Sequence, residues 1–277
     1  MPMVEGADGA LYYEICDVVP PWRQPAETIL FLNGLAIDAD IWVTWLPRLV
    51  DRYRIVRTDL RGFGRSFVPA AGAPWSLERI AHDVRAVMAV AGLERVHFVG
   101  ESTGGTVGLH LAAHAPEVLL TLTTVSAAHR GGSINRAQQL RDDIAKVGMD
   151  AWSEDLMRLR FPAGALSEPM WRWFHDVQRS STPHACVDLV DMLVAADLSA
   201  ELESIRVPTL VIAPDASPFV SVESQTERMR AMPACELHVV AGARHGVAFS
   251  HGPECARVLR DFIERRSPAR ERPSAGA

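Results

Sequence analysis

The stretch 99–105, Val-Gly-Glu-Ser-Thr-Gly-Gly, is the feature that most constrains the fold of this chain. The apolar run 95–99 predicts a short strand before it, and the apolar residues after it predict a helix. Gly100 and Gly104 have no Cβ, so the backbone between strand and helix can turn tightly and hold Ser102 in a strained conformation. The pattern Gly-x-Ser-x-Gly between a strand and a helix is typical of a nucleophilic serine whose hydroxyl points away from a sheet.

Strand and helix patterns alternate along most of the chain. Strands are predicted at 11–19, 28–32, 53–57, 95–99, 119–125, 209–212 and 236–240, and helices at 41–50, 75–91, 222–232 and 253–265, besides the helix after Ser102. The run 28–32 is apolar throughout, as expected of a strand buried on both faces. The alternation predicts an α/β fold with a doubly wound, mostly parallel sheet.

The alternation stops between residues 130 and 204. This part shows only helical patterns, at 134–147, 151–159, 169–178 and 186–196. We therefore predict a core formed by 1–129 and 205–266, with a helical cap at 130–204 inserted after the sixth strand. The stretch 267–277 is rich in Pro, Arg and Ala and is predicted to be a disordered tail.

Composition narrows the class of partner. The net charge of −6 over 277 residues argues against a nucleic-acid surface. The four cysteines are scattered and lack metal-ligand spacing, which favours reduced thiols in a cytoplasmic protein. No secretory signal and no apolar run of membrane-spanning length is visible. We expect a monomer or homodimer that acts on a small molecule without metal, cofactor, nucleic acid or membrane.

A serine hydroxyl needs a neighbouring base before it becomes nucleophilic. His245 follows the last predicted strand directly, so it is expected at the carboxyl edge of the sheet, where Ser102 also lies. His251 is the competing candidate, six residues later at the start of the last helix. We predict that His245 is the base. Glu101, beside the serine, is expected to be a packing or hydrogen-bonded residue of the turn.

Four features together resemble the α/β-hydrolase fold family: Asn33-Gly34, the loop 59–66 with sequence Asp-Leu-Arg-Gly-Phe-Gly-Arg-Ser, the turn at Ser102, and His245. Within this family the chain is similar to bacterial esterases and lactonases, including 3-oxoadipate enol-lactonases. The resemblance implies a catalytic triad in the order Ser, acid, His. It also implies an oxyanion hole made by the backbone N–H groups of Leu35 and Thr103.

The acid of the triad is where the chain departs from the family. The family acid follows the seventh strand, and that register places Ser217 there, with Asp215 two residues early. In some relatives the acid follows the sixth strand, where this chain has Ser126. Asp215 could turn toward His245, Ser217 or Ser126 could orient it as a neutral acceptor, or another carboxylate could reach it. We expect Asp215 to be the acid.

These residues predict a cofactor-free serine hydrolase of carboxylic esters or lactones. Aromatic residues of the cap, together with Asn33, are expected to line a pocket for a small apolar or ring-bearing substrate. The cap residues are Trp152, Phe161, Trp171 and Trp173. A carbon–carbon bond hydrolase of aromatic breakdown and a non-catalytic ligand-binding protein are the alternatives.

Overall fold

The centre of the fold is a sheet with eight strands in the part of the chain that the computed structural model describes, residues 2–266. Their order across the sheet is β1-β2-β4-β3-β5-β6-β7-β8. β1 and β2 are antiparallel, β2 pairs antiparallel with β4, and the remaining pairs are parallel. The strands are β1 (Met3–Glu5), β2 (Ala10–Cys16), β3 (Thr28–Leu32), β4 (Arg54–Thr58), β5 (Val96–Glu101), β6 (Leu119–Val125), β7 (Thr209–Pro214) and β8 (Cys235–Val240).

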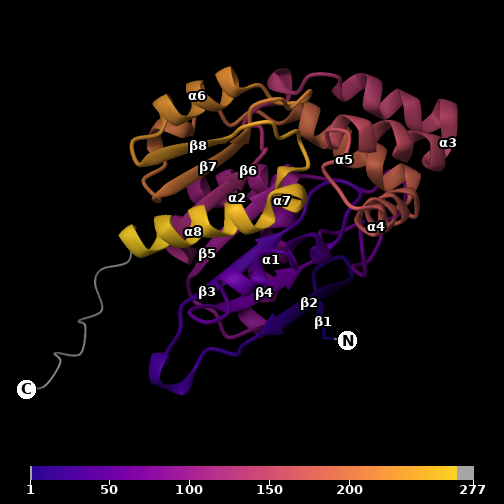
Figure 1. The fold of residues 1–277 in the computed structure, drawn as a ribbon. Coiled ribbons are helices and arrows are strands. Elements are labelled where there is room, and N and C mark those ends of the chain that lie inside the picture. Colours follow the sequence, from indigo (N-terminus) through magenta and orange to yellow (C-terminus); the bar gives the residue numbers. More distant parts are fainter. Residues whose placement is uncertain (1, 267–277) are drawn as a thin grey trace, which may run out of the picture.

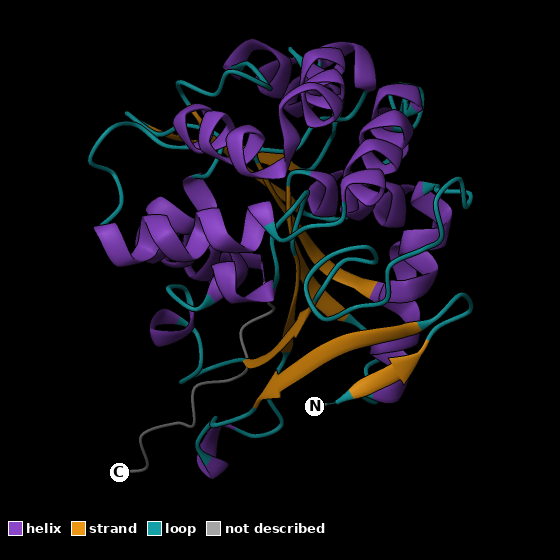
Figure 2. Cartoon of the chain, turned by 90° about the vertical axis from the view of Figure 1, so that its right-hand side faces the viewer, coloured by secondary structure: helices purple, strands orange, loops and turns teal. Residues whose placement is uncertain are grey.

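Helices cover both faces of the twisted sheet (Figures 1 and 2). The alternating side chains of β3 show the division, because Leu30 and Leu32 belong to one buried cluster and Ile29 and Phe31 to the other. The first cluster includes side chains of α1 (Leu77–Val90) and α2 (Thr103–His114). The second includes side chains of α8 (Gly252–Arg266) and of the short 3-10 helix η2 (Ala39–Trp42). The sheet is therefore doubly wound, as the sequence predicts.

Between β6 and β7 the chain forms three long helices that lie together beyond one end of the sheet (Figure 1). They are α3 (Ala137–Arg160), α4 (Glu168–Arg179) and α5 (Pro183–Ala195). We call them the cap helices. The other α-helices are α6 (Val222–Ala231) and the single turn α7 (Val247–Ser250). The predicted tail, 267–277, lies outside the described residues.

Two elements differ from the sequence prediction, the helix expected at 41–50 and the first strand. The helix expected at 41–50 is replaced by η2 and the 3-10 helix η3 (Leu46–Arg48), because Pro47 in η3 has no N–H to continue a helical ladder. The two helices expected at 134–147 and 151–159 are present within α3, which is kinked between them where Gly148 adopts a φ of 76°. A first strand, β1, is not predicted by the sequence pattern because it is only three residues long.

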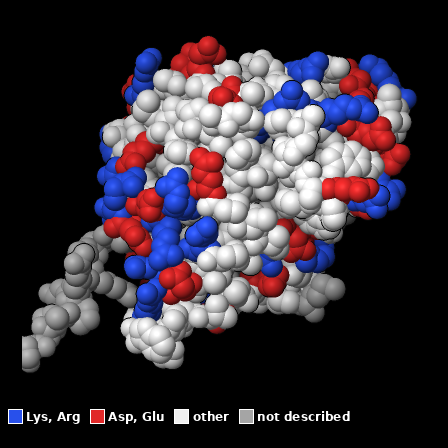
Figure 3. Space-filling view, in the orientation of Figure 1, with Lys and Arg blue, Asp and Glu red and all other residues white. Residues whose placement is uncertain are grey.

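Charged residues of both signs are mixed on the face shown in Figure 3, over α8 and over the cap helices. On α8, for example, Arg260 contacts Asp51 at 2.9 Å. This part of the surface has no large region of a single sign. Within residues 2–266, no helix is both long and apolar enough to cross a membrane.

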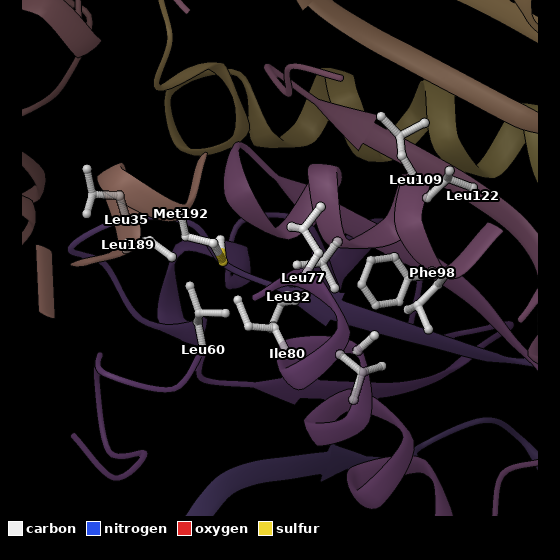
Figure 4. Close-up of a cluster of buried hydrophobic side chains, with 14 of the residues drawn as sticks. Leu32, Leu35, Leu60, Leu77, Ile80, Phe98, Leu109, Leu122, Leu189 and Met192 are labelled. Atoms are coloured by element: carbon white, nitrogen blue, oxygen red, sulfur yellow. The ribbon is translucent and has the colours of Figure 1, made fainter. Parts of the chain in front are cut away.

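Side chains under α2 pack at close range against the middle of the sheet. Phe98 on β5 and Leu122 on β6 are fully buried there (Figure 4). Gly108 lies in the middle of α2, and a Cβ at this position would lie 2.6 Å from Leu122 Cδ1 and 2.9 Å from Phe98 Cε1. The missing side chain at Gly108 therefore lets α2 approach the sheet closely.

Gly108→Ala tests this packing. Alanine in an exposed helix is normally more stable than glycine by about 0.5–1 kcal/mol, but overpacking a core costs about 1–3 kcal/mol. We expect the substitution to lower the free energy of unfolding by about 1–2 kcal/mol, measured by urea denaturation. Gly132→Ala is the matched control, because Gly132 is exposed and a Cβ there would meet no described neighbour within 4 Å. Equal stability of the two variants would contradict close packing at Gly108.

Candidate active site

Ser102 lies in the turn between β5 and α2, with φ 50° and ψ −114°. A non-glycine residue rarely has positive φ, and the surrounding chain holds Ser102 in this strained conformation. Its N–H donates to the Val125 carbonyl at 2.8 Å, and its carbonyl accepts from Gly105 N–H at 3.0 Å. A Cβ at Gly100 would collide with the backbone of Gly104. The turn therefore needs glycine, as predicted, because a side chain would clash with the neighbouring backbone.

His245 reaches the serine from the loop between β8 and α7. Its Nε2 lies 3.2 Å from Ser102 Oγ, within hydrogen-bonding distance. The ring is 6% exposed and packs edge-on against Phe219. The competing candidate, His251, instead contacts Ser250 Oγ through its Nδ1 at 2.9 Å. The structure thus brings together Ser102 and His245, as the sequence predicts.

The expected acid, Asp215, does not face His245. Its side chain is exposed just after β7, and its backbone N–H donates to the Val240 carbonyl at 3.2 Å. Ser217 is the residue beside the ring, with Oγ 3.4 Å from His245 Nδ1. The preference for Asp215 is therefore corrected. The chain turns after Asp215, and only the residue two positions later points toward the imidazole.

Ser217 is a poor substitute for a carboxylate. Its Oγ accepts from the N–H groups of Phe219 and Val220, both at 3.3 Å. A hydroxyl can both donate to and accept from an imidazole nitrogen, so Ser217 does not fix which nitrogen of His245 carries the proton. A carboxylate only accepts, and would instead hold the proton on Nδ1 and leave Nε2 free to act as a base. Ser126, the other hydroxyl considered, is buried, and its Oγ has no hydrogen-bond partner among the described residues.

A buried pair of opposite charges lies next to Ser102 and His245. Glu101, the last residue of β5, has its Oε1 3.8 Å from Arg160 Nη1 and 3.9 Å from His245 Nε2. Arg160, the last residue of α3, donates from Nη2 to the Leu35 carbonyl at 2.8 Å, and its guanidinium lies over the Phe174 ring. Both side chains are 2% exposed. A cap helix thus reaches directly into the site.

Burial and charge shift the titration of these groups. Burial, followed by the neighbouring Arg160 cation, lowers the pKa of His245 to about 3. Burial raises the pKa of Glu101 to about 7, although Arg160 and the Gly34 N–H both act to lower it. His245 is therefore neutral at physiological pH, which is the form that a general base needs.

The cavity above Ser102 is mostly apolar. Core residues Leu35, Ser102, Thr103 and His245 line it together with cap residues. The lining also includes Thr106, Ser126, Ala128, Ile134, Ala137, Leu140, Leu156, Arg160, Val190, Leu193, Phe219 and Val220. Thr103 begins α2, so its N–H belongs to the first turn of a helix, where N–H groups lack partners within the helix. Leu35 and Thr103, the two predicted oxyanion donors, therefore both border the cavity that contains Ser102.

The five predicted pocket residues are not among the lining of this cavity. Trp152 donates from Nε1 to the Leu140 carbonyl at 3.0 Å, and Asn33 accepts from Leu60 N–H at 2.9 Å. Phe161 packs against Phe174, Trp173 stacks on Phe249, and Trp171 stacks on His175. The prediction that these five residues line the pocket is therefore corrected. The spacing of aromatic residues along a helix does not show which neighbours each ring will contact. Aliphatic cap residues line the cavity instead.

With this geometry established, comparison with known proteins identifies the family. The model of the α/β-hydrolase fold matches residues 27–252. The chain belongs to the α/β-hydrolase fold family. A protein of Caulobacter segnis, named "Putative carbamate hydrolase RutD", is 28% identical over 257 residues, which cover 90% of this chain and 96% of that protein.

Solved α/β-hydrolase structures share the fold. The enol-lactonase from Burkholderia xenovorans LB400 has a TM-score of 0.86 at 24% identity, covering 95% of this chain and 100% of the other. An esterase from Exiguobacterium antarcticum has a TM-score of 0.83 at 20% identity, covering 95% of this chain and 98% of the other. The fold and the resemblance predicted from the sequence are thus confirmed, and the chain is a hydrolase by family.

Sequence reasoning missed that Glu101 and Arg160 lie beside Ser102 and His245. The sequence predicts a packing or hydrogen-bonded role for Glu101, yet its carboxylate lies within 4 Å of the imidazole. One feature of the sequence could have indicated this position of Glu101: it is a charged residue at the end of a mostly apolar strand, directly before the serine. Arg160 follows Leu156 by one helical turn, and this spacing places both on the cavity side of α3.

Asp215→Asn and Ser217→Ala separate the two candidate partners of His245. We expect Asp215→Asn to change kcat/KM for a short p-nitrophenyl ester by less than about twofold, because the side chain is exposed. Ser217→Ala removes a neutral hydrogen bond worth about 1 kcal/mol and should lower kcat/KM about fivefold. The reverse order of effects would restore Asp215 as the partner of His245.

The imidazole of His245 is expected to stay neutral from pH 8 to pH 5, because burial and Arg160 hold its pKa at about 3. An ordinary histidine would protonate within this range. Histidine ring nitrogen shifts, measured by NMR during a pH titration and assigned with His245→Gln, provide the check. Protonation of His245 near pH 6.5 would show that its surroundings are more polar than the structure indicates.

Proposed function

We propose that this protein is a cofactor-free serine hydrolase that cleaves carboxylic esters or lactones of small, apolar substrates through an acyl-enzyme. The main observation behind this proposal is that His245 Nε2 lies 3.2 Å from Ser102 Oγ beneath a mostly apolar cavity. Hydrolase membership of the family and the strained turn at Ser102 support the same conclusion.

The proposed reaction uses these positions as follows. Ser102 Oγ attacks the substrate carbonyl carbon while His245 Nε2 takes the hydroxyl proton, and the carbonyl π electrons move to oxygen. The N–H groups of Thr103 and Leu35 stabilise that oxyanion, and losing one such donor typically costs about 3 kcal/mol. The carbonyl then re-forms as the C–O bond to the leaving group breaks, and His245 gives its proton to the leaving alkoxide. Water, deprotonated by His245, attacks the acyl carbon, and the bond to Ser102 Oγ breaks as Oγ takes the proton back from His245.

The cavity lining sets the expected substrate. Most of its side chains are aliphatic, and Phe219 contributes one aromatic ring. Such a surface favours an apolar acyl or alcohol part over a sugar or a polyanion. Carbamates are a second candidate, because a Caulobacter segnis relative that covers 90% of this chain is named "Putative carbamate hydrolase RutD". A carbamate has the same reacting carbonyl, so the same serine and histidine serve both.

Ser102→Ala is the decisive variant. We expect at least a 10³-fold loss of kcat for short p-nitrophenyl esters, because the attacking atom is removed, with an unchanged melting temperature. A fluorophosphonate should label the wild-type protein at Ser102 and leave Ser102→Ala unlabelled. Wild-type activity in the variant would remove the mechanism. Absence of both labelling and hydrolysis in the wild type would favour a non-catalytic binding protein.

A panel of substrates then separates the candidate reactions. It contains a small lactone, a p-nitrophenyl ester, a carbamate, and a chromogenic dienone that reports carbon–carbon bond hydrolysis. We expect the highest kcat/KM for the ester or the lactone. Preference for the dienone by tenfold or more would replace ester hydrolysis with carbon–carbon bond cleavage at the same serine.

A further inference from the structure

Within residues 2–266, no carboxylate lies at Nδ1 of His245, the nitrogen where the family's triad acid would lie. Ser217, a neutral hydroxyl, occupies that side at 3.4 Å from Nδ1. Among the described residues, only Glu101 has a carboxylate oxygen within 4 Å of either ring nitrogen of His245, and it approaches Nε2. The negative charge nearest to the base therefore comes from β5, next to the nucleophile itself.

The surroundings of Glu101 are unusual for a residue that merely packs. Its Oε2 is buried without a hydrogen-bond partner among the described residues, and so are Nε and Nη1 of Arg160. A buried ion pair stabilises a fold only with good geometry and satisfied hydrogen bonds, and an apolar pair of the same volume is often at least as stable. The 3.8 Å separation of Glu101 and Arg160 meets neither condition. Stability alone does not explain this pair.

The fold also makes room for the carboxylate. A Cβ at Gly34 would collide with Glu101 Oε2 and would lie 2.9 Å from Ser102 Cβ. The Gly34 N–H acts on the same carboxylate. Thus the loop after β3, the end of β5 and the end of α3 all border the position of this one charge.

We propose that Glu101 supplies the negative charge that stabilises the imidazolium of His245 during catalysis, and that Arg160 positions the Glu101 carboxylate. The inference rests on the proposed serine hydrolase function. When Ser102 attacks, the proton passes from Oγ to His245 Nε2, and Glu101 takes up no proton. Its charge acts on the new cation from 3.9 Å.

Arg160 makes the contribution of Glu101 larger. The Arg160 cation disfavours a second positive charge on His245. Glu101 Oε1 lies within 4 Å of both Arg160 Nη1 and His245 Nε2. Removing the carboxylate would leave the arginine charge unopposed beside the developing imidazolium. Replacing the acid of a triad by its amide costs about 10⁴-fold, and we expect a smaller loss here because Glu101 is not hydrogen-bonded to the ring.

The proposal has a pH signature that packing would not produce. The groups facing Glu101 are Arg160 from α3, His245 from the loop before α7, Ser102 from its own turn and the Gly34 N–H from the loop after β3. Burial raises the pKa of Glu101 to about 7, and only its ionised form stabilises the imidazolium. Activity should therefore fall as the pH decreases through 7, although His245 itself is still neutral there.

The experiment measures kcat/KM for a p-nitrophenyl ester in Glu101→Gln, in Ser217→Asp and in the double variant. Ser217→Asp places a carboxylate at Nδ1, where the Phe219 and Val220 N–H groups can also bind it. We expect Glu101→Gln to lose about 10²-fold and Ser217→Asp to gain at least about tenfold. In the Ser217→Asp background, Glu101→Gln should lose less than about fivefold, because the new carboxylate supplies the charge.

Equal losses from Glu101→Gln in both backgrounds would show a structural role and overturn the proposal. Asp215→Asn, which removes an exposed carboxylate of the same loop, is the control and should match the wild type. If Glu101→Gln does not fold, the wild-type pH profile decides, since a flat kcat/KM from pH 5 to 8 also overturns the proposal. Loss of activity in Ser102→Ala together with full activity in Glu101→Gln would refute only the role of Glu101.

Discussion

Close contact between the end of β5 and the start of α2 is the constraint on which the site depends. The backbone of Gly100 approaches that of Gly104, and a side chain on Gly104 would meet the carbonyl of Leu32 on the neighbouring strand. The turn between them therefore has little freedom, and Ser102 is held at positive φ. This rigidity places the hydroxyl within 3.2 Å of an imidazole 143 positions later in the chain.

Charge around that contact is arranged differently from the usual triad. The loop after β7 offers a hydroxyl where a carboxylate is expected, and the buried carboxylate nearby belongs to β5. Glu101 and Arg160 lose their hydration on burial, and their mutual attraction at 3.8 Å offsets only part of that penalty. Buried charges with perturbed pKa values cluster at functional sites. The site thus combines a well-ordered nucleophile and base with a displaced source of negative charge.

The pattern of apolar residues along the sequence predicted the strands and helices that pack into the core. The five-residue run of β3 is buried throughout, and α1 begins after Ser76, whose side chain accepts from Arg79 N–H. Both features follow from local chemistry, and so does the turn at Ser102. The preference for Asp215 over Ser217 failed, since the direction of a loop side chain depends on turn geometry. The partners of Glu101 were equally hidden, because they come from elements far away in the sequence.

The link from Arg160 to the core has a consequence for how this protein can change. The end of α3 is fixed at two points, by the Arg160 guanidinium on the Leu35 carbonyl and by the Arg160 carbonyl on the Gly246 N–H. Leu35 carries one expected oxyanion donor, and Gly246 directly follows the base. Cap and core are consequently not interchangeable modules. A chimera that takes its cap from another hydrolase would need an arginine at position 160 that fits Glu101 and the Leu35 carbonyl of this core.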